Sequence, residues 1–463
     1  MTDVGLILPR YEGAYDGPVG AHDYAQSLLS DLNVAGATLP DAPREHPVFA
    51  WARSGAMALT GFRGEPPRVC PVPVASCADG ALMALASLGA RSLPADLSGA
   101  RLLGERAAIA GFSRNGSTSI GGTCRLLEAS DGWIAINLAR DDDWDMLPAL
   151  VEQNIKLRWP ALATAAREME TDILVARGRE IGLPIARHGS VHVVDRWFEI
   201  VKNGGSGRFS GRQSPIVVDL SSLWAGPLCS HLLRLMGARV VKVESLKRPD
   251  GARLGPSQFY DLMNGGKESV ALDFSTVQGR EALLSLIAKA DIVIESSRPR
   301  ALRQLGIFAE TLIEKHPGLI WLSITGYGRR GDEANWVAFG DDAGVAAGLN
   351  SLISRRGARP IFCGDAIGDP LTGLHGALLA WSRWQSRRGG LLAITLRDVV
   401  ARCATFDRQS PIANAAEREI EWEGLLSARR ISAAPPTARR PENAARPLGA
   451  DNAKVLRELE VFC

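Results

Sequence analysis

The sequence predicts an α/β protein built on a doubly wound, mostly parallel sheet, with a smaller α+β domain. Short apolar runs alternate with helix-like stretches through the second half of the chain. Polar and glycine-rich segments follow these runs, as at the carboxyl ends of parallel strands, where such sheets bind ligands. The chain has 463 residues, 46% of them hydrophobic, which allows a large core and two or three domains.

Four apolar runs predict buried parallel strands: Ile216–Leu220, Arg239–Glu244, Asp291–Glu295 and Leu319–Thr325. Two helices are expected between them, Pro227–Met236 and Gly279–Ala290. Strands separated by helices form βαβ units, so the four runs are expected in one sheet.

The region before residue 205 has a different pattern. Its helix-like stretches are Gly80–Leu88, Leu147–Ile155 and Trp159–Arg177, and its strand-like segment is Gly132–Leu138. We divide the chain into an N-terminal region (1–205), a Gly- and Ser-rich linker (206–215), a large domain (216–430) and a linker with a terminal helix, Ala450–Glu460 (431–463).

Composition excludes several classes of function. The formal net charge of +2 gives no basis for binding nucleic acid or an anionic membrane. Seven scattered cysteines without a CxxC pair indicate neither a disulfide framework nor a zinc site, and they fit a reducing compartment, so we expect a cytoplasmic protein. The first residues, MTDVGLILPRYEG, do not resemble a signal peptide, and no apolar run of about 18 residues predicts a membrane span.

The chain contains an internal repeat that starts at Ser54 and again at Ala347. Four pairs align at a constant separation of 293 positions (373 − 80): Gly55 with Gly348, Gly64 with Gly357, Pro67 with Pro360, and Gly80 with Gly373. In this register Asp369 falls opposite Ser76, so one copy keeps a carboxylate and the other does not.

An ordered set of motifs resembles the family III (CaiB/BaiF) CoA-transferases. The motifs are Val218–Pro227 (VDLSSLWAGP), Gly237–Glu244 (GARVVKVE), Asn264–Phe274 (NGGKESVALDF), Asp291–Arg300 (DIVIESSRPR), Ser323–Gly328 (SITGYG), Gly368–Gly376 (GDPLTGLHG) and Arg446–Leu459 (RPLGADNAKVLREL). The resemblance covers most of residues 216–400 and the tail, and 46–200 more loosely. Glu268 stands where the family usually has Arg.

The order of these parts departs from the family, in which the large domain comes first. Here Asn115–Gly122 (NGSTSIGG) resembles the Gly-rich loop over the active site, and Ser130–Asn137 with Trp144 resembles the small-domain core. The chain therefore resembles a fused pair in which the first copy lacks its large domain and the second its small domain. Together they are expected to supply about one active site.

The resemblance implies an acyl-CoA transferase that moves CoA from an acyl-CoA donor to a carboxylic acid. Asp369 would be the nucleophile and form an aspartyl-CoA thioester. Asp341 and Asp342 would orient the acceptor or tune Asp369. Coenzyme A would be a substrate, with no prosthetic group and no metal, and it would be bound by Trp224, Arg253, Asn264, Lys267, Arg298 and Tyr327.

Each of these residues also has a structural interpretation. Asp369 before Pro370 is typical of a helix N-cap with proline at N1, and Asp341 and Asp342 also suit a cap or turn. The basic residues suit a solvated surface, the two aromatic residues suit the core, and Asn115–Gly122 suits a flexible turn.

Other functions remain open at this point. An α-methylacyl-CoA racemase or epimerase would need a histidine near Phe339 or Gly340, where none is found. A non-catalytic CoA-binding subunit is favoured by the reordered parts, by Glu268 and by Ser76. Gly326–Gly331 (GYGRRG) fits GxGxxG, but no helix follows it, so we reject NAD. The resemblance implies a homodimer, and a second CoA-transferase-like subunit is the other partner to consider.

Overall fold

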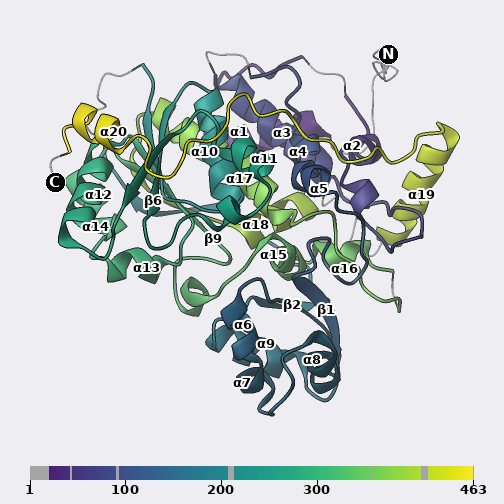
Figure 1. Cartoon of the computed structure of the whole chain (residues 1–463). Helices are drawn as coiled ribbons and strands as arrows, with labels where there is room; N and C mark the ends of the chain where they lie inside the picture. The colour runs from purple at the N-terminus through teal and green to yellow at the C-terminus, as the bar shows by residue number, and fades with distance from the viewer. Residues whose placement is uncertain are drawn as a thin grey trace.

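The computed structural model describes residues 20–41, 44–89, 93–206, 213–355, 357–407 and 415–461, and these form two β-sheets with helices around them (Figure 1). The N-terminal segment considered for a signal peptide lies outside the described residues, as do positions 207–212 of the expected linker.

The large sheet has seven strands in the order β4-β10-β9-β8-β5-β6-β7. Its strands are β4 (Phe198–Asn203), β5 (Ile216–Asp219), β6 (Arg239–Ser245), β7 (Glu268–Leu272), β8 (Ile292–Glu295), β9 (Ile320–Thr325) and β10 (Gly390–Thr395). β4 is antiparallel to β10, and all the other neighbours are parallel. The four predicted strands are β5, β6, β8 and β9, and the predicted fold class is confirmed.

The sequence patterns did not reveal three of the strands. β4 is an edge strand with side chains that are half-buried or exposed, so it lacks the continuous apolar run of a central strand. β7 begins with Glu268 and Ser269, which are polar although the strand is largely buried. β10 pairs with β4 through a shift in register between Leu391 and Leu392.

Helices cover both faces of the large sheet. One face packs mainly against α10 (Ala225–Leu235), α11 (Ser257–Asn264), α17 (Gly368–Gln385) and α18 (Leu396–Ala404). The other packs against α12 (Val277–Lys289), α14 (Ala309–Lys315) and α20 (Asn452–Glu458), with α13 (Pro299–Gln304) nearby. Alternate residues of a strand therefore enter different cores, as with Val217 and Val218 of β5.

The first part of the chain shares the core of the first face. Its helices are α1 (Ala21–Asp31), α2 (Pro47–Arg53), α3 (Val74–Ser87), α4 (Gly99–Leu102) and α5 (Glu105–Ala110). α3 packs on α17, next to α15 (Gly340–Ala347) and α16 (Leu349–Ile353). The core therefore runs without a break between the N-terminal helices and the large sheet.

The second sheet is antiparallel, in the order β1 (Cys124–Ala129), β2 (Gly132–Asn137) and β3 (Ile185–His188). Its helices are α6 (Asp141–Asp145), α7 (Leu147–Val151), α8 (Trp159–Ala166) and α9 (Thr171–Glu180), and they enclose a core of their own. Figure 1 shows this unit as a lobe below the main body. The single stretch expected over Trp159–Arg177 is thus two helices.

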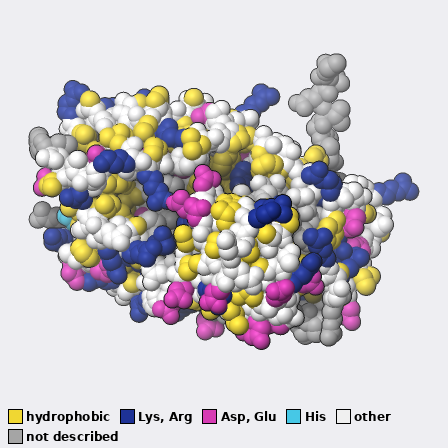
Figure 2. Space-filling view, turned by 60° about the horizontal axis from the view of Figure 1, so that its bottom comes forward, with side chains coloured by type: hydrophobic (Ala, Val, Ile, Leu, Met, Phe, Trp, Pro, Cys, Tyr) yellow, Lys and Arg dark blue, Asp and Glu magenta, His cyan; other side chains and the backbone are white. Residues whose placement is uncertain are grey.

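Acidic and basic side chains both occur across the face of the molecule that Figure 2 shows.

The predicted linker near the C-terminus is an extended segment, which Figure 1 shows crossing the molecule from α19 (Ala415–Ala428) to α20. It is bound to both parts of the chain: Ala434 N–H donates to Ala52 O (2.7 Å), and Ala445 N–H donates to Asp261 Oδ1 (2.8 Å). Arg439 also pairs with the buried Glu105 (2.6 Å). The segment therefore joins the N-terminal helices to the large sheet.

The sequence repeat is also a structural repeat. α2 and α3 correspond to α15 and α17 at the same separation of 293 positions, and equivalent positions meet where Trp381 Nε1 donates to Leu88 O (3.2 Å). An added Cβ at Gly80 would lie 2.5 Å from Ala21 O of α1, and one at Gly373 would lie 2.8 Å from Ala225 O of α10. Each repeat thus packs a helix closely against its central glycine, in the same way.

None of the helices in the described part of the chain has both the length and the apolar composition needed to cross a membrane.

Candidate active site

Asp369 is the second residue of α17, and Ile367 is the N-cap of that helix. The capping role that the Asp-Pro pair suggested is therefore wrong. Instead, the carboxylate reaches another helix, where Asp369 Oδ2 accepts a hydrogen bond from the N–H of Gly340 (3.1 Å). The residue is partly exposed, whereas its neighbours Gly368 and Pro370 are buried.

Two more carboxylates lie beside Asp369, and we call Asp341, Asp365 and Asp369 the acid cluster. Asp341 is on α15 and is 8% exposed; Asp365 precedes α17 and is fully buried. Asp341 Oδ1 accepts a hydrogen bond from the N–H of Ala366 (3.0 Å), so the cluster joins the start of α15 to the start of α17. Ala366 has a positive φ of 41°, which bends the backbone between Asp365 and Asp369.

The first repeat supplies a cation to the acid cluster. Arg106 of α5 donates from Nε to the two Asp365 oxygens (3.1 and 3.0 Å), and its Nη2 also donates to Asp365. The same guanidinium lies over the ring of Trp224, 5.2 Å from the ring centroid. Arg106 is therefore held by a fork-shaped ion pair on one side and an aromatic face on the other.

The electrostatics of the cluster favour protonation of its carboxyls. Burial raises the pKa of Asp369 to about 7; Arg106 opposes this rise, and Asp341 adds to it. Burial likewise raises the pKa of Asp341 to about 6, with Arg106 opposing and Asp365 adding. Near neutral pH, Asp369 therefore has both a protonated and an ionised population.

Asp342 lies apart from the acid cluster although it follows Asp341 directly. It is fully buried, and its Oδ1 accepts from the N–H of Phe339 (2.9 Å) and from Asn137 Nδ2 (3.4 Å). Burial raises the pKa of Asp342 to about 8, against the hydrogen bond from Phe339. Its contacts are those of a residue that joins α15 to the small sheet.

The glycine-rich segment Asn115–Gly122 adjoins the acid cluster. Ser119 is buried and hydrogen-bonded to Asp341. The segment is fixed by Gly116 N–H donating to Gly61 O and by Phe362 N–H donating to Gly116 O, both at 2.9 Å. It is therefore a closely held loop between the two repeats, and the flexible turn is not what the structure shows.

Residues 214–418 match the sequence profile of CoA-transferase family III, and this stretch contains Asp341, Asp365 and Asp369. This region belongs to CoA-transferase family III. An acyl-CoA transferase of Fusarium pseudograminearum is 32% identical over 35% of this chain and 40% of that protein. The (R)-2-hydroxy-4-methylpentanoate CoA-transferase of Clostridioides difficile is 32% identical over 34% of this chain and 42% of that protein.

The solved structure of a CaiB/BaiF family protein from Brucella suis is 28% identical, with a TM-score of 0.39, over 47% of this chain and 58% of that chain. The chain thus matches less than half of the length of the curated relatives named above.

Arginines gather at the carboxyl ends of the family III strands. Arg298 follows β8; its burial lowers its pKa, and the nearby charges of Arg300, Arg140 and Arg248 lower it further. Several positive charges this close to Arg298 mark a place where an anion would be stabilised. The loops after β5 and β8 are joined there by Ser222 N–H donating to Ser296 Oγ (3.1 Å).

The structure places Lys267 and Asn264 in the interior of the family III region. Lys267 is 2% exposed, and its ammonium donates to Asp219 Oδ2 (3.1 Å), Ser230 Oγ (2.7 Å) and Asn264 Oδ1 (3.0 Å). This departs from the expected contact with a CoA phosphate, because the buried ammonium already has internal partners. A buried charge of this kind is held by its ion pair and hydrogen bonds.

Arg253 and Tyr327 are also engaged within the protein. Arg253 donates from Nη2 to Glu244 Oε2 (2.6 Å) and lies over the ring of Tyr260. Tyr327 is 2% exposed and packs edge-on against Trp336. Trp224 is buried as well, at 3% exposed, with Arg106 over its ring and Phe259 edge-on against it. Of the six residues expected to hold CoA, Arg298 is half-buried and follows a strand end.

Sequence reasoning missed Arg106 and Asp365, whereas Ser119 lies in the glycine-rich segment that the sequence analysis had already picked out. Asp365 stands four positions before Asp369 in GDAIGD, so a search for paired carboxylates would have found it. Arg106 carries no local signal, because it precedes Asp369 by more than two hundred positions and meets the cluster only through folding.

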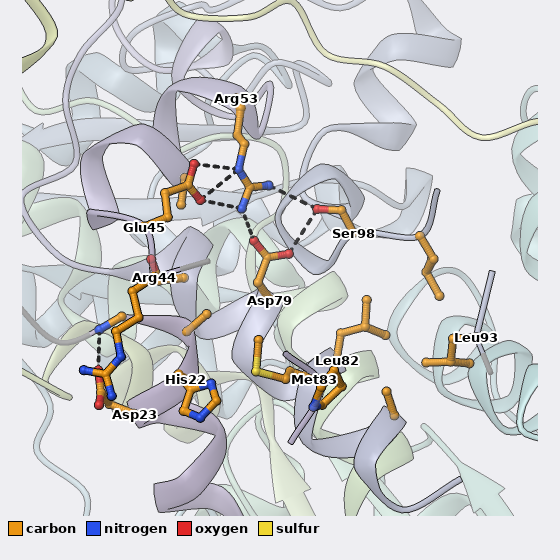
Figure 3. A pocket seen from close by; sticks show the side chains of 17 residues that line it. His22, Asp23, Arg44, Glu45, Arg53, Asp79, Leu82, Met83, Leu93 and Ser98 are labelled. Atoms are coloured by element: carbon orange, nitrogen blue, oxygen red, sulfur yellow. Dashed lines mark hydrogen bonds and ion pairs between the residues drawn. The ribbon is translucent and has the colours of Figure 1, made fainter. Parts of the chain in front are cut away.

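The first repeat has a concavity at the position that corresponds to the acid cluster. Ser76, the counterpart of Asp369, lines a pocket of about 360 Å³, which Figure 3 shows. Its polar wall is an ion-pair network in which Arg53 bonds Glu45 (2.7 Å) and Asp79 (2.5 Å). The chemistry of this pocket thus differs from that of the acid cluster.

The other positions of the acid cluster are also changed in the first repeat. At the separation of 293, Asp341 corresponds to Val48 and Asp365 to Val72. Gly340, whose N–H donates to Asp369, corresponds to Pro47, which has no N–H to donate. The first repeat therefore lacks all three carboxylates and the backbone donor.

Proposed function

We propose that the protein is a CoA-transferase that moves CoA from an acyl-CoA to a carboxylic acid, with Asp369 as the nucleophile. The observation that carries the proposal is the setting of Asp369. Asp369 is a partly exposed residue at the start of a long helix, in the part of the chain that matches CoA-transferase family III, and its carboxylate lies among other acids. The position of the residue in a helix N-terminus favours its ionised form, while the neighbouring carboxylates oppose it.

The first half of the reaction replaces the acyl group's sulfur with an aspartyl oxygen. The Asp369 carboxylate attacks the donor thioester carbonyl, which forms a mixed anhydride and releases CoA thiolate. The thiolate then attacks the aspartyl carbonyl of the anhydride, so that the donor acid leaves and Asp369 carries CoA as a thioester.

The second half runs the same steps with the acceptor. The acceptor carboxylate attacks the aspartyl thioester, which forms a second anhydride and releases CoA thiolate. Attack of the thiolate on the acceptor carbonyl gives the new acyl-CoA and restores the Asp369 carboxylate. Each step forms one acyl bond and breaks another, so no oxidant, metal or external base is required.

Backbone N–H groups near Asp369 would stabilise the oxyanions of these steps. The N–H of Gly340 already points at Asp369 Oδ2, and the loop Asn115–Gly122 adjoins the cluster. Arg298 with its neighbouring arginines would hold the CoA phosphates at the strand ends.

The test is intact-protein mass spectrometry after incubation with a panel of acyl-CoAs and trapping with hydroxylamine. Hydroxylamine cleaves an aspartyl thioester and leaves a hydroxamate on the residue, so the wild type is expected to gain a hydroxamate at Asp369. Asp369→Asn should gain none. Asp342→Asn is the matched control, because it removes a neighbouring buried carboxylate outside the cluster and should still give the adduct. A wild type that binds CoA but gives no adduct with any donor would refute the proposal and favour a non-catalytic CoA-binding subunit.

A further inference from the structure

Arg106 connects the two repeats at the acid cluster. It belongs to α5, which follows the first repeat, and it meets Asp365 between α16 and α17 of the second. Although burial opposes it, the charges of Asp365, Asp341 and Asp369 raise the pKa of Arg106, and its hydrogen bonds within the cluster go to Asp365. The first repeat has lost its own carboxylates but supplies this cation to the second.

We propose that Arg106 is a positioning residue for Asp369: through its ion pair with Asp365 it balances the charge of the acid cluster, so that Asp369 can ionise and attack a thioester. This inference rests on the proposed function only for the last step, the attack. The ionisation of Asp369 can be measured whether or not the protein transfers CoA.

The balance of charge is the physical reason. Three carboxylates meet in a largely buried space, and ionised neighbours repel one another strongly where water is excluded. Asp365 is fully buried, and both of its carboxylate oxygens accept hydrogen bonds from Arg106. The charges of Arg106 and Asp365 cancel when the two are paired. Within the acid cluster, Asp341 is then the remaining negative charge that opposes ionisation of Asp369.

The geometry fixes Arg106 in this role. Its planar group bonds both Asp365 oxygens while its face lies on Trp224, an arrangement that a lysine ammonium cannot reproduce. Because Trp224 also lies at the N-terminus of α10, beside the ligand-binding ends of the strands, the guanidinium links the nucleophile's surroundings to the expected path of CoA.

The experiment measures the protonation of Asp369 directly in the full-length protein. A carbodiimide with an amine nucleophile modifies a carboxyl group through its protonated form, and peptide mapping reports the labelling of Asp369 as a function of pH. For the wild type we expect a midpoint near 7. For Arg106→Met we expect the midpoint to rise by about 1–3 pH units, since an opposite charge at this range shifts a carboxyl by that much.

A double variant separates the role of the pair from a role in folding. Arg106→Met leaves Asp365 buried without its partner and can unfold the protein, whereas Arg106→Met with Asp365→Asn removes both charges. The double variant is expected to label with a midpoint within about one pH unit of the wild type. Arg106→Lys keeps the charge without the fork and should give a midpoint between those of the wild type and Arg106→Met.

Two results would overturn the inference. Folded Arg106→Met with an unchanged midpoint would show that Arg106 does not affect the ionisation of Asp369. If the labelling midpoint of the double variant rose by more than two pH units, the ionisation of Asp369 would not be controlled by the neutral pair of Arg106 and Asp365. In parallel, the hydroxylamine adduct of Arg106→Met should form more than tenfold more slowly at pH 7 and recover at high pH. If no protein forms an adduct but the labelling shifts occur, the proposed transfer fails while the role of Arg106 stands.

Discussion

The residues of the acid cluster show how burial turns ordinary carboxylates into a site that responds near neutral pH. Asp369, Asp341 and Arg106 are common residue types, and their properties here come from the exclusion of water and from one another's charges. Asp342 has the same chemistry and a raised pKa, yet it contacts the small sheet and not Asp369. A shifted pKa alone therefore does not distinguish a nucleophile from a structural carboxyl group.

Adduct formation at Asp369 should depend on pH with a midpoint near 7. The attacking form is the carboxylate, which Arg106 favours and Asp341, Asp365 and burial oppose. Below the midpoint the single-turnover rate should fall about tenfold per pH unit, and above it the rate should reach a plateau. Quenched-flow mass spectrometry measures this rate, with Asp342→Asn as the control. A rate that falls as pH rises from 6 to 8 would contradict the role of an ionised Asp369.

Asp342→Asn should stabilise the protein at alkaline pH. The pKa of Asp342 is about 8 in the folded protein, above its ordinary value, so the folded state holds a proton that the unfolded state has released. Stability contributed by this group is therefore lost as pH rises from about 4 to about 8. At pH 9 the variant should exceed the wild type by about 1 kcal/mol or more in unfolding free energy, and the difference should shrink at pH 5. Denaturant titration at pH 9 and pH 5 measures the difference in unfolding free energy, with the exposed Asp145→Asn as the control. A difference of the same size at the two pH values would refute this explanation.

At the scale of elements, close contacts between helix starts build the site. α15 and α17 approach each other through Gly340 and Gly368, so the backbone of one helix lies against the carboxylate of the other. Two other glycines allow a similar close contact between helices: the backbone of α10 lies against Gly373, and the backbone of α1 lies against Gly80. Glycine at these places is needed for the space it leaves, which brings two helices within hydrogen-bonding distance.

Gly340→Ala should disrupt the site. A Cβ at this position would lie 2.2 Å from Ala366 O and 2.4 Å from Asp369 Oδ2, so the nucleophile or the backbone must move. We expect a loss of about 1–3 kcal/mol in unfolding free energy and a loss of the adduct of more than tenfold. Gly344→Ala is the matched control on the same helix, because its Cβ would meet nothing closer than 3.4 Å. Equal effects of the two substitutions would indicate that helix α15 as a whole, and not the contact with Asp369, is disturbed.

At the scale of the whole molecule, the chain folds as two unequal repeats that make one acid cluster. The N-terminal region (1–205) gives Arg106, Ser119 and the edge strand β4, and the rest of the chain gives the three carboxylates and the other strands of the large sheet. The C-terminal segment crosses both. The division of the site between repeats makes the two parts of the chain depend on each other.

A chain truncated to residues 213–461 should give no adduct at Asp369. It lacks Arg106 and the loop Asn115–Gly122, and it exposes the edge of β10 where β4 pairs. We expect it to aggregate or to fold without activity, and we expect adduct formation to return when residues 1–206 are produced together with it. The measurement is the hydroxylamine trap on each preparation. A truncated chain that forms the adduct at the rate of the full chain would show that the first repeat contributes nothing to the site.

The sequence by itself determined the class of fold, the repeat and the residue most suited to be the nucleophile. The strands that were predicted, such as Ile216–Leu220, have continuous apolar runs that only a doubly covered strand needs. Asp369 could be singled out because it stands in an ordered set of motifs and because its counterpart in the repeat is Ser76. Local patterns carry this information because periodicity and motif order are properties of neighbouring residues.

Only the tertiary structure decided which polar residues meet. The edge strand β4 could not be recognised, because its half-exposed side chains give no apolar run. Lys267 is an anion-binding residue by type, but burial against Asp219 commits its charge to the interior. Asp341 and Asp342 are adjacent in sequence, but Asp341 accepts a hydrogen bond from the N–H of Ala366, before α17, and Asp342 accepts one from Asn137. Arg106 reaches Asp365 across 259 positions, and such a contact depends on how whole elements pack, which no local pattern encodes.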